Sequence, residues 1–341
     1  MFQWITVLET LGYILIFPGF LFCFLVGLFL SGVDRKIVAK MQKRVGPPLL
    51  QPFYDLFKLF GKETIVPDAA SKGTFLMAPL FGLASLIVLQ LIIPIFSFSA
   101  FNTMADVIVI LYLLLIPAIS VMIGGAASGS PYAGIGLSRE MVTVIACELP
   151  LVLVLLSVAK TVGNAMGEGL VFSMKGIMDF QLANGSLITK VSMIPAAIAF
   201  LLIIPGETGS HPFDTAEAET EICEGLLAEY SGPPLGVYKL SHSIKVLTLS
   251  SLFVALFLGG IGRYIAALVG KFGLGAAATG MLTGLIGAIV LVLLCVLITI
   301  LFISLVHAVT ARLKIEQVFK YYWTVVTGLA ALSLVLAWFK L

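Results

Sequence analysis

Eight long apolar runs limit the possible folds of this sequence more than any other feature. An α-helix needs about 20 predominantly apolar residues to cross the hydrocarbon core of a bilayer. Most of the runs reach that length, whereas one is short and ends at Pro205 and another contains Glu148. The sequence therefore predicts an all-α integral membrane protein, a single polytopic membrane domain over residues 1–341 with about eight transmembrane helices. The runs are Leu11–Val33, Phe75–Ser97, Val107–Ala127, Glu140–Lys160, Val191–Pro205, Leu240–Gly262, Met281–Val306 and Tyr321–Phe339.

Composition agrees with this reading and excludes other classes. Hydrophobic residues make up 60% of the 341 and charged residues only 11%, whereas soluble domains are about a quarter charged. A chain of this length needs no extra apolar surface to build a core, so the excess is expected to face lipid. The formal net charge of +2 and the lack of a basic stretch interleaved with aromatic residues argue against a nucleic-acid partner.

The cysteines and the first ten residues carry less information. Cys23, Cys147, Cys223 and Cys295 form no Cys-x-x-Cys pair, so we do not expect this chain alone to bind zinc or an iron–sulfur cluster. Each is interpreted as a small buried hydrophobic residue. Residues 1–10 contain Glu9 and no basic residue, so no cleavable signal peptide is expected and the first helix should remain in place.

The distribution of Lys and Arg predicts the orientation in a cell membrane. With an even number of spans, both termini lie on one side, and the loops on the other side hold most of the basic residues. The positive-inside rule then places both termini outside and the large loops in the cytoplasm. The predicted cytoplasmic basic residues are Arg35, Lys36, Lys40, Lys43, Arg44, Lys58, Lys62, Lys72, Arg139, Lys239, Arg312, Lys314 and Lys320.

The first predicted cytoplasmic segment, residues 34–72, contains an amphipathic pattern. Apolar residues recur there at helical spacing on one face, with polar residues on the other. Such a stripe is typical of a helix lying in the membrane interface, and Gly46-Pro47-Pro48 supplies the turn before it. The apolar face comprises Leu49, Leu50, Phe53, Leu56, Phe57 and Phe60, and the polar face Gln51, Asp55, Lys58 and Lys62.

The second cytoplasmic segment, residues 206–239, is strongly acidic. A helix beginning near Asp214 would place Asp214, Glu217, Glu221 and Glu224 on one face, with Glu219 pointing elsewhere. Dense like charges and burial raise the pKa of carboxyl groups, so such acids could hold a proton near neutral pH or bind a cation. Glu207 and Glu229 flank the cluster, and no basic residue lies between Glu207 and Lys239.

Two plainer interpretations of this segment stay open. Asp214 with Glu217 three residues later is typical of a capping box at a helix start. The whole run could also be a solvated acidic face. A metal site is not expected, because acids along one helix face without a second ligand cluster rarely hold one.

Glu148 is the second candidate, because an ionisable residue inside a span is costly and by default a functional hypothesis. It lies about two turns into its apolar run, and Glu140, eight residues earlier, shares roughly the same helix face. Arg139 could pair with one of these two acids, which would leave Glu140 merely interfacial. Lys245, inside the start of another run, could pair with a glutamate of the acidic segment. Asp106, His242 and His307 lie near span ends and are interpreted as interfacial or satisfied polar residues.

Several motifs follow one another along the chain, namely Asp34-Arg35-Lys36, Gln42-x-Arg44-x-Gly46-Pro47, Gln51-Pro52-x-x-Asp55-x-x-Lys58-x-x-x-Lys62-Glu63, Pro212-Phe213-Asp214-x-x-Glu217-Ala218-Glu219-x-Glu221 and Glu229-Tyr230-Ser231-Gly232. In this order they resemble one family, the subunit of respiratory complex I that docks the peripheral arm and forms the quinone cavity (the subunit 1 family). The resemblance covers nearly the whole chain.

Within that family, details are more similar to the corresponding subunit of membrane-bound energy-converting [NiFe] hydrogenases of the formate hydrogenlyase type and of a related sulfur-reducing complex. Complex I members usually carry a basic residue just before Pro-Phe-Asp, where this chain has Ser210-His211, and favour Glu where Asp34 stands. These departures argue against quinone binding. The segments that carry this similarity are Gly129-Ser130-Pro131-Tyr132-Ala133, Ser138-Arg139-Glu140, Val66-Pro67-Asp68-Ala69 and Ala311-Arg312-Leu313-Lys314.

The resemblance implies a non-catalytic coupling subunit of an oxidoreductase complex that binds no cofactor itself. It implies partners, namely large and small soluble hydrogenase-like subunits with iron–sulfur clusters and, in the hydrogenase case, a Ni–Fe centre, together with antiporter-like membrane subunits. It assigns a proton or ion relay to Glu140, Glu148, Glu207, Asp214, Glu217, Glu219, Glu221, Glu224 and Glu229, and docking of the soluble arm to Arg44, Asp55, Lys58 and Glu63.

Two rival functions remain at this point. A stand-alone ion or solute transporter would also need buried acids, but it usually shows paired repeats or broken helices, and no convincing internal repeat is seen here. A structural anchor for a soluble enzyme would not need Glu148.

Overall fold

The structure, a computed structural model, describes residues 10–96, 106–167, 169–271 and 276–339. Within these ranges the chain is helical, and the only β-type pairing is an isolated bridge between Asp106 and Ser173. Eight helices are long and apolar enough to cross a membrane, which confirms the predicted number. They are Thr10–Met41, Lys72–Ile92, Val107–Ala127, Pro131–Met166, Val191–Thr208, Gly232–Phe257, Thr279–Val309 and Ile315–Trp338. Residues 1–9 and 340–341, at the two ends of the chain, lie outside the described ranges.

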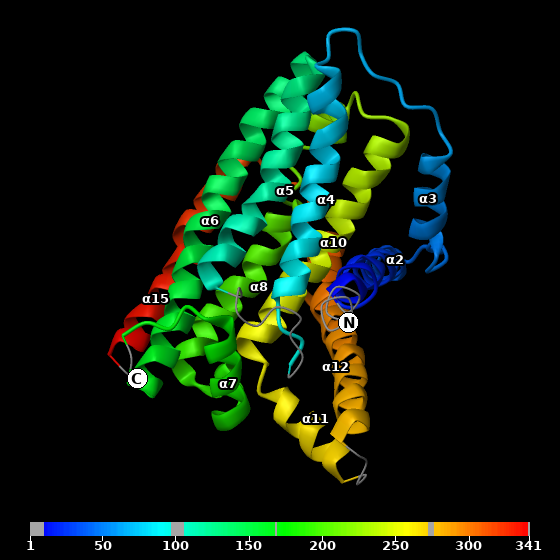
Figure 1. Cartoon of the computed structure of the whole chain (residues 1–341). Coiled ribbons are helices and arrows are strands. Elements are labelled where there is room, and N and C mark those ends of the chain that lie inside the picture. Colours follow the sequence, from blue (N-terminus) through cyan, green and yellow to red (C-terminus); the bar gives the residue numbers. More distant parts are fainter. Residues whose placement is uncertain (1–9, 97–105, 168, 272–275, 340–341) are drawn as a thin grey trace.

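Figure 1 shows a bundle of long helices with one short helix, α3, beside its upper half. The elements are α2 (Phe20–Met41), α3 (Gln51–Phe60), α4 (Lys72–Ile92), α5 (Val107–Ser128), α6 (Pro131–Met166), α7 (Met174–Asn184), α8 (Ile194–Thr208), α9 (Glu219–Ile222), α10 (Gly232–Phe257), α11 (Ile261–Gly270), α12 (Ala276–Ile298), α13 (Leu305–Val309), α14 (Ile315–Tyr321) and α15 (Thr327–Trp338). Short 3₁₀ turns occupy Leu187–Thr189, Val191–Met193 and Gly225–Leu227, and π-helical turns occupy Thr299–Ser304 and Tyr322–Val326.

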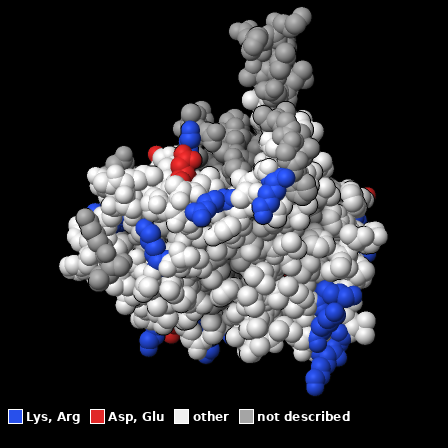
Figure 2. All heavy atoms as spheres, turned by 90° about the horizontal axis from the view of Figure 1, so that it is seen from below, with Lys and Arg blue, Asp and Glu red and all other residues white. Residues whose placement is uncertain are grey.

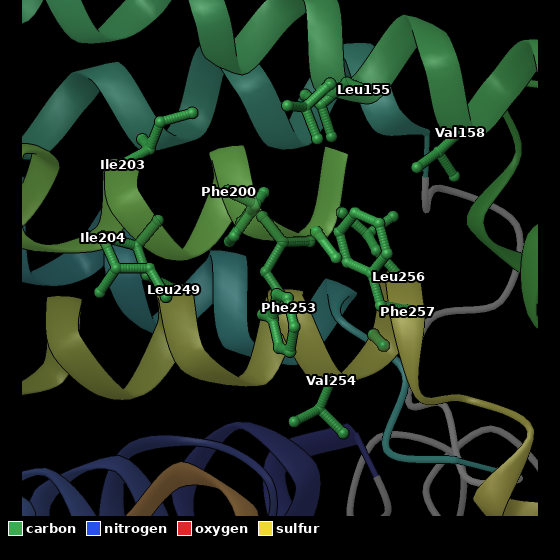
Figure 3. Packing of buried hydrophobic residues seen from close by; sticks show 14 of the residues in the cluster. Leu155, Val158, Phe200, Ile203, Ile204, Leu249, Phe253, Val254, Leu256 and Phe257 are labelled. Carbon is green, nitrogen blue, oxygen red and sulfur yellow. The ribbon is translucent and has the colours of Figure 1, made fainter. Parts of the chain in front are cut away.

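Helix α10 is the centre of the bundle. Of its most apolar stretch, 94% is buried, far more than in any other span among the described residues. Phe253 and Phe257 of α10 pack against Phe200 of α8, with ring centroids 5.9 and 6.2 Å apart. Figure 3 shows these rings together with Leu155 of α6, so apolar contact between α6, α8 and α10 holds the middle of the bundle together.

Helix α3 has the predicted amphipathic character, but its apolar residues divide between two sides. Leu56 is buried toward the bundle, and Phe53 packs against Phe24 of α2 with a centroid distance of 6.0 Å. Phe57 and Phe60 are exposed instead. Helix α3 packs on α2 and α10 with one face only, so protein covers only part of its wide apolar stripe.

Two local predictions are wrong. No helix begins near Asp214: residues 211–218 form turns, and α9 covers only Glu219–Ile222 before Cys223 and Glu224 adopt positive φ. Cys223 is exposed, whereas Cys23, Cys147 and Cys295 are buried as expected.

Charged side chains are sparse on the face seen from below. Figure 2 shows white residues over most of that face, with scattered basic groups and one group of Lys and Arg at its lower right edge. The acidic segment and the loop before α4 lie at the opposite, upper end of Figure 1. We call this end the loop side.

A close contact near the end of α8 provides a test of the packing. A methyl group on Gly206 would overlap the hydroxyl and ring of Tyr322, which is fully buried and donates a hydrogen bond to the Leu202 carbonyl. Because the ring cannot move aside, we expect Gly206→Ala to lower the stability of the purified protein by about 1–3 kcal/mol. Thermal unfolding in detergent measures this. Gly280→Ala, where the added methyl meets open space, is the control, and equal unfolding temperatures for the two variants would contradict the packing described.

Candidate functional site

A cavity of about 350 Å³ lies on the loop side, between the acidic segment and the membrane-spanning helices. Helices α2, α3, α5, α6, α8 and α10 contribute to its wall. Pro52, Leu56 and Leu59 of α3 form part of one side, and the 209–217 turn forms another. Its charged and titratable lining residues are Arg35, Asp55, Glu140, Glu207, Asp214, Glu217, Glu224, Lys239, His242, Lys245 and Arg312.

At the inner wall of the cavity, a buried ion pair joins two spans. The Lys245 Nζ of α10 lies 3.1 Å from the Glu207 Oε1 of α8, as the sequence suggested for Lys245. The Glu207 side chain is 2% exposed and that of Lys245 is 10% exposed. An isolated charge at this depth would be very costly, so each of the two groups supplies the opposite charge that the other needs.

Glu140 and Glu148 both lie on α6, about two turns apart. Glu140 lines the cavity, and both acids are within electrostatic range of Glu207 and Lys245. The Glu148 Oε1 is buried and has no hydrogen-bond partner within the described residues. Arg139 pairs with neither acid. Glu148 is therefore an ionisable group inside a span that the fold brings close to the Lys245–Glu207 pair.

Two arginines from outside the acidic segment hold its turns in place. The Arg312 guanidinium donates two hydrogen bonds to the two Asp214 carboxylate oxygens, and the His211 Nδ1 lies 3.4 Å from Asp214. Arg139 forms a salt bridge with Glu221 and donates to the Thr215 carbonyl at 3.3 Å. These contacts explain why no helix forms from Asp214, since the arginines bind the acids one by one instead of leaving them stacked on one repelling face.

The cavity shifts the pKa of Glu217. Protein surrounds this carboxylate, although the cavity leaves the side chain accessible to water. Burial and the negative charges of Glu140, Asp214 and Glu224 raise its pKa to about 7, against a weaker opposing effect of Lys239. Glu217 can therefore exchange a proton near neutral pH.

The pKa of Asp55 is shifted in the opposite direction. Burial alone would raise its pKa, but hydrogen bonds from Gln51 and Arg35 and the positive charges of Arg35 and Lys239 outweigh that effect and lower it. The Arg35–Asp55 bond is 2.8 Å long and ties α3 to α2. The structure thus puts Asp55 in the cavity wall, ionised and paired.

The predicted relay residues separate into groups. The cavity brings together Glu140, Glu207, Asp214, Glu217 and Glu224, while Glu148 is not among its lining residues but lies within electrostatic range of the ion pair. Glu221 is held by Arg139, Glu229 is exposed, and the side chain of Glu219 lies outside the described part of the structure. Of the predicted docking residues, Arg44, Lys58 and Glu63 are exposed at the surface around α3.

Apart from Lys245, the sequence did not reveal the partners of the acids. Arg312 was named as a cytoplasmic basic residue and as part of a motif but not as the partner of Asp214, and His211 and His307 were not connected. Their rings lie 5.0 Å apart, and Asp34 nearby accepts a hydrogen bond from Ser304. No local pattern signals these contacts, because Asp34, His211 and Ser304 are far apart in the chain. Within the described residues, no group of three or more His, Cys, Asp or Glu is arranged to hold a metal ion.

The Lys245–Glu207 ion pair should contribute measurably to the stability of the folded protein. Lys245→Met leaves the Glu207 charge buried without its partner, so we expect a loss of about 3–5 kcal/mol. Glu207→Gln in the same chain removes the stranded charge and should recover part of the loss. Thermal unfolding of the purified protein measures both, and Lys239→Met, at an exposed lysine of the same cavity, is the control. An unchanged unfolding temperature for Lys245→Met would be incompatible with the ion pair.

Titration of Glu217 can be measured directly. Burial and nearby negative charges raise its pKa from the ordinary value of 4.5 to about 7 in the folded protein, so the folded state binds the extra proton between these two values. Its contribution to stability is complete below about pH 4.5 and declines as pH rises toward 7. Infrared spectra should contain a protonated-carboxyl band that disappears with a midpoint near pH 7 and is absent in Glu217→Gln. A band unchanged in the variant would refute this assignment.

Comparison with known proteins identifies relatives along nearly the whole chain. The family model described as NADH dehydrogenase matches residues 14–338. "Formate hydrogenlyase subunit 4" of Escherichia coli (strain K12) is 31% identical over 88% of this chain and 91% of its own length. "Hydrogenase-4 component C" of the same organism is 35% identical over 72% of this chain and 76% of its own length.

A solved structure agrees with the sequence relatives. One chain of the membrane-bound sulfane sulfur reductase, described as an archaeal respiratory membrane complex, superimposes with a TM-score of 0.82 at 28% identity. The match covers 97% of this chain and 99% of that one. The predicted resemblance to the complex I subunit 1 family, and to its hydrogenase and sulfur-reducing members, is confirmed.

Proposed function

We propose that this chain, which belongs to the NADH dehydrogenase family, is the membrane coupling subunit of a complex I-like redox-driven ion pump. Its relatives are named as components of hydrogenase, formate hydrogenlyase and NADH-quinone oxidoreductase systems, and none of those quoted is named as a stand-alone transporter. The observation that carries the proposal is the series of carboxylates that runs from the acidic turns through the cavity to Glu148 inside a span.

A soluble redox arm docks on the loop side in this proposal. Arg44, Lys58 and Glu63 supply exposed charges around α3 for that contact. Asp55, assigned to the same task by the resemblance, acts there through its bond to Arg35, which fixes α3 on α2. The arm consists of large and small hydrogenase-like subunits and carries the iron–sulfur clusters and, in a hydrogenase, the Ni–Fe centre. The protein lies in the cell membrane, and its loop side faces the cytoplasm.

Coupling is electrostatic. Electron or proton movement in the arm changes the charge near Asp214, Glu217 and Glu224, and coupled acids respond by redistributing protons. Glu217 is suited to respond first, because its pKa of about 7 lets a small change of field alter its charge. The change passes to Glu140 and the Lys245–Glu207 pair, and from there to Glu148.

The Lys245–Glu207 ion pair lies close enough to Glu140 and Glu148 to influence their charge. A change of charge at Glu217 acts on Glu140, and Glu140 and Glu148 both lie within electrostatic range of Lys245 and Glu207. Antiporter-like membrane subunits next to this chain then move H⁺ or Na⁺. A transmembrane potential of 100 mV corresponds to about 2.3 kcal/mol per charge, similar to a pKa shift of one to two units, so the acids can deliver energy of the required size.

Replacement of Glu148 by Gln tests the proposed role. The amide keeps the size of the side chain and cannot change charge, so the complex should assemble and keep its redox reaction while redox-driven ion uptake into vesicles falls at least tenfold. Subunit composition, redox activity and ion uptake are measured on the same preparation.

Glu316→Gln, at an exposed acid of α14, is the matched control and should leave all three unchanged. Full coupled uptake in Glu148→Gln would support a structural anchor instead. Purification of the native chain alone, with ion transport but no redox subunits, would support the stand-alone transporter.

A further inference from the structure

The end of α2 and the segment that follows it carry basic side chains that the proposed coupling path does not use. Residues 35–62 contain seven Lys and Arg and one acidic residue, Asp55, which Arg35 neutralises. Lys40 and Lys43 are exposed and Lys36 is partly exposed, and no salt bridge within the described residues involves them. This end of α2 therefore presents an unneutralised positive charge directly after a transmembrane span.

An uncovered apolar surface lies next to these charges. Pro52, Leu56 and Leu59 of α3 face the cavity, whereas the opposite side of the helix exposes Leu50, Tyr54, Phe57 and Phe60. The Phe57 ring lies 6.5 Å from that of Phe24 on α2, so this surface continues onto the span. On α2, Leu21 and Leu25, three residues before and one residue after Phe24, are also exposed.

Apolar side chains at the level of a span, bordered by lysines where the span ends, match the two parts of a phospholipid. We propose that the end of α2 together with α3 binds anionic phospholipids, with headgroup phosphates at Lys36, Lys40 and Lys43 and acyl chains along Phe57, Leu25 and Leu21. A group of four to eight basic residues beside a transmembrane helix attracts anionic lipid, by about fivefold in affinity per residue. Three lysines should thus give up to about a hundredfold preference over zwitterionic lipid.

An acidic protein surface is the other partner that lysines attract. The exposed aromatic and aliphatic side chains favour lipid, because they are continuous with α2 side chains at the depth of the bilayer, which a soluble protein does not reach. The site would hold α3, and with it one wall of the cavity, against the membrane surface. The proposal concerns lipid affinity alone and does not depend on the coupling role.

The test uses the intact complex purified in mild detergent through this chain. The complex is incubated with equal amounts of phosphatidylglycerol and phosphatidylcholine and washed, and retained lipids are counted by native mass spectrometry. The wild type should retain phosphatidylglycerol preferentially, and the triple variant Lys36→Gln, Lys40→Gln, Lys43→Gln should reduce that preference at least tenfold. Lys175→Gln, Lys271→Gln, Lys320→Gln changes three exposed lysines elsewhere and should leave it intact.

A second variant separates charge from folding. Lys36→Arg, Lys40→Arg, Lys43→Arg keeps the charge and should keep the preference, even if the glutamine variant is unstable. Equal retention of the two lipids by the wild type would overturn the proposal. So would a glutamine variant that keeps its lipid preference but loses soluble subunits, since the lysines would then bind an acidic protein surface.

Discussion

The ion pair between Lys245 and Glu207 is the interaction on which the rest of the site depends. It joins the last turn of α8 to the middle of α10, the most buried helix described, and it holds two charges that neither helix could bury alone. Since the pair is neutral overall, the acids around it, Glu140 and Glu148, experience both a cation and an anion at close range. Movement of one proton near the pair therefore changes the electric field at both acids. The same ion pair that stabilises the fold also connects the acids of the proposed relay.

The acidic segment is organised by cations that come from other parts of the chain. Arg312 and Arg139 each bind one carboxylate and fix the turns over the cavity, while Glu217 and Glu224, which line its wall, form no salt bridge within the described residues. Burial and neighbouring negative charges raise the pKa of Glu217 to about 7. This division between structural and titratable acids gives a physical reason for the high density of carboxylates in such a short segment.

The sequence predicted the features that depend on local pattern. Apolar runs located the eight spans. The cost of an intramembrane charge singled out Glu148 as an ionisable residue inside a span. The pairing of Lys245 with a glutamate of the acidic segment was also anticipated, because a lysine inside a span requires a partner. The helix predicted from Asp214 did not form, since helical spacing cannot reveal that Arg139 and Arg312 lie within reach. The exposure of Cys223 was also missed. Cys223 lies in a turn with a positive φ, and no local pattern in the sequence indicates that turn.

The central claim is that charge movement at the redox arm changes the protonation of carboxylates in this chain. Infrared difference spectroscopy on the intact complex, triggered by injection of single electrons into the arm, tests it most directly. We expect carboxyl bands that change on electron arrival and that are lost when Glu217 is replaced by Gln. Electron arrival without any carboxyl change attributable to this chain would contradict it.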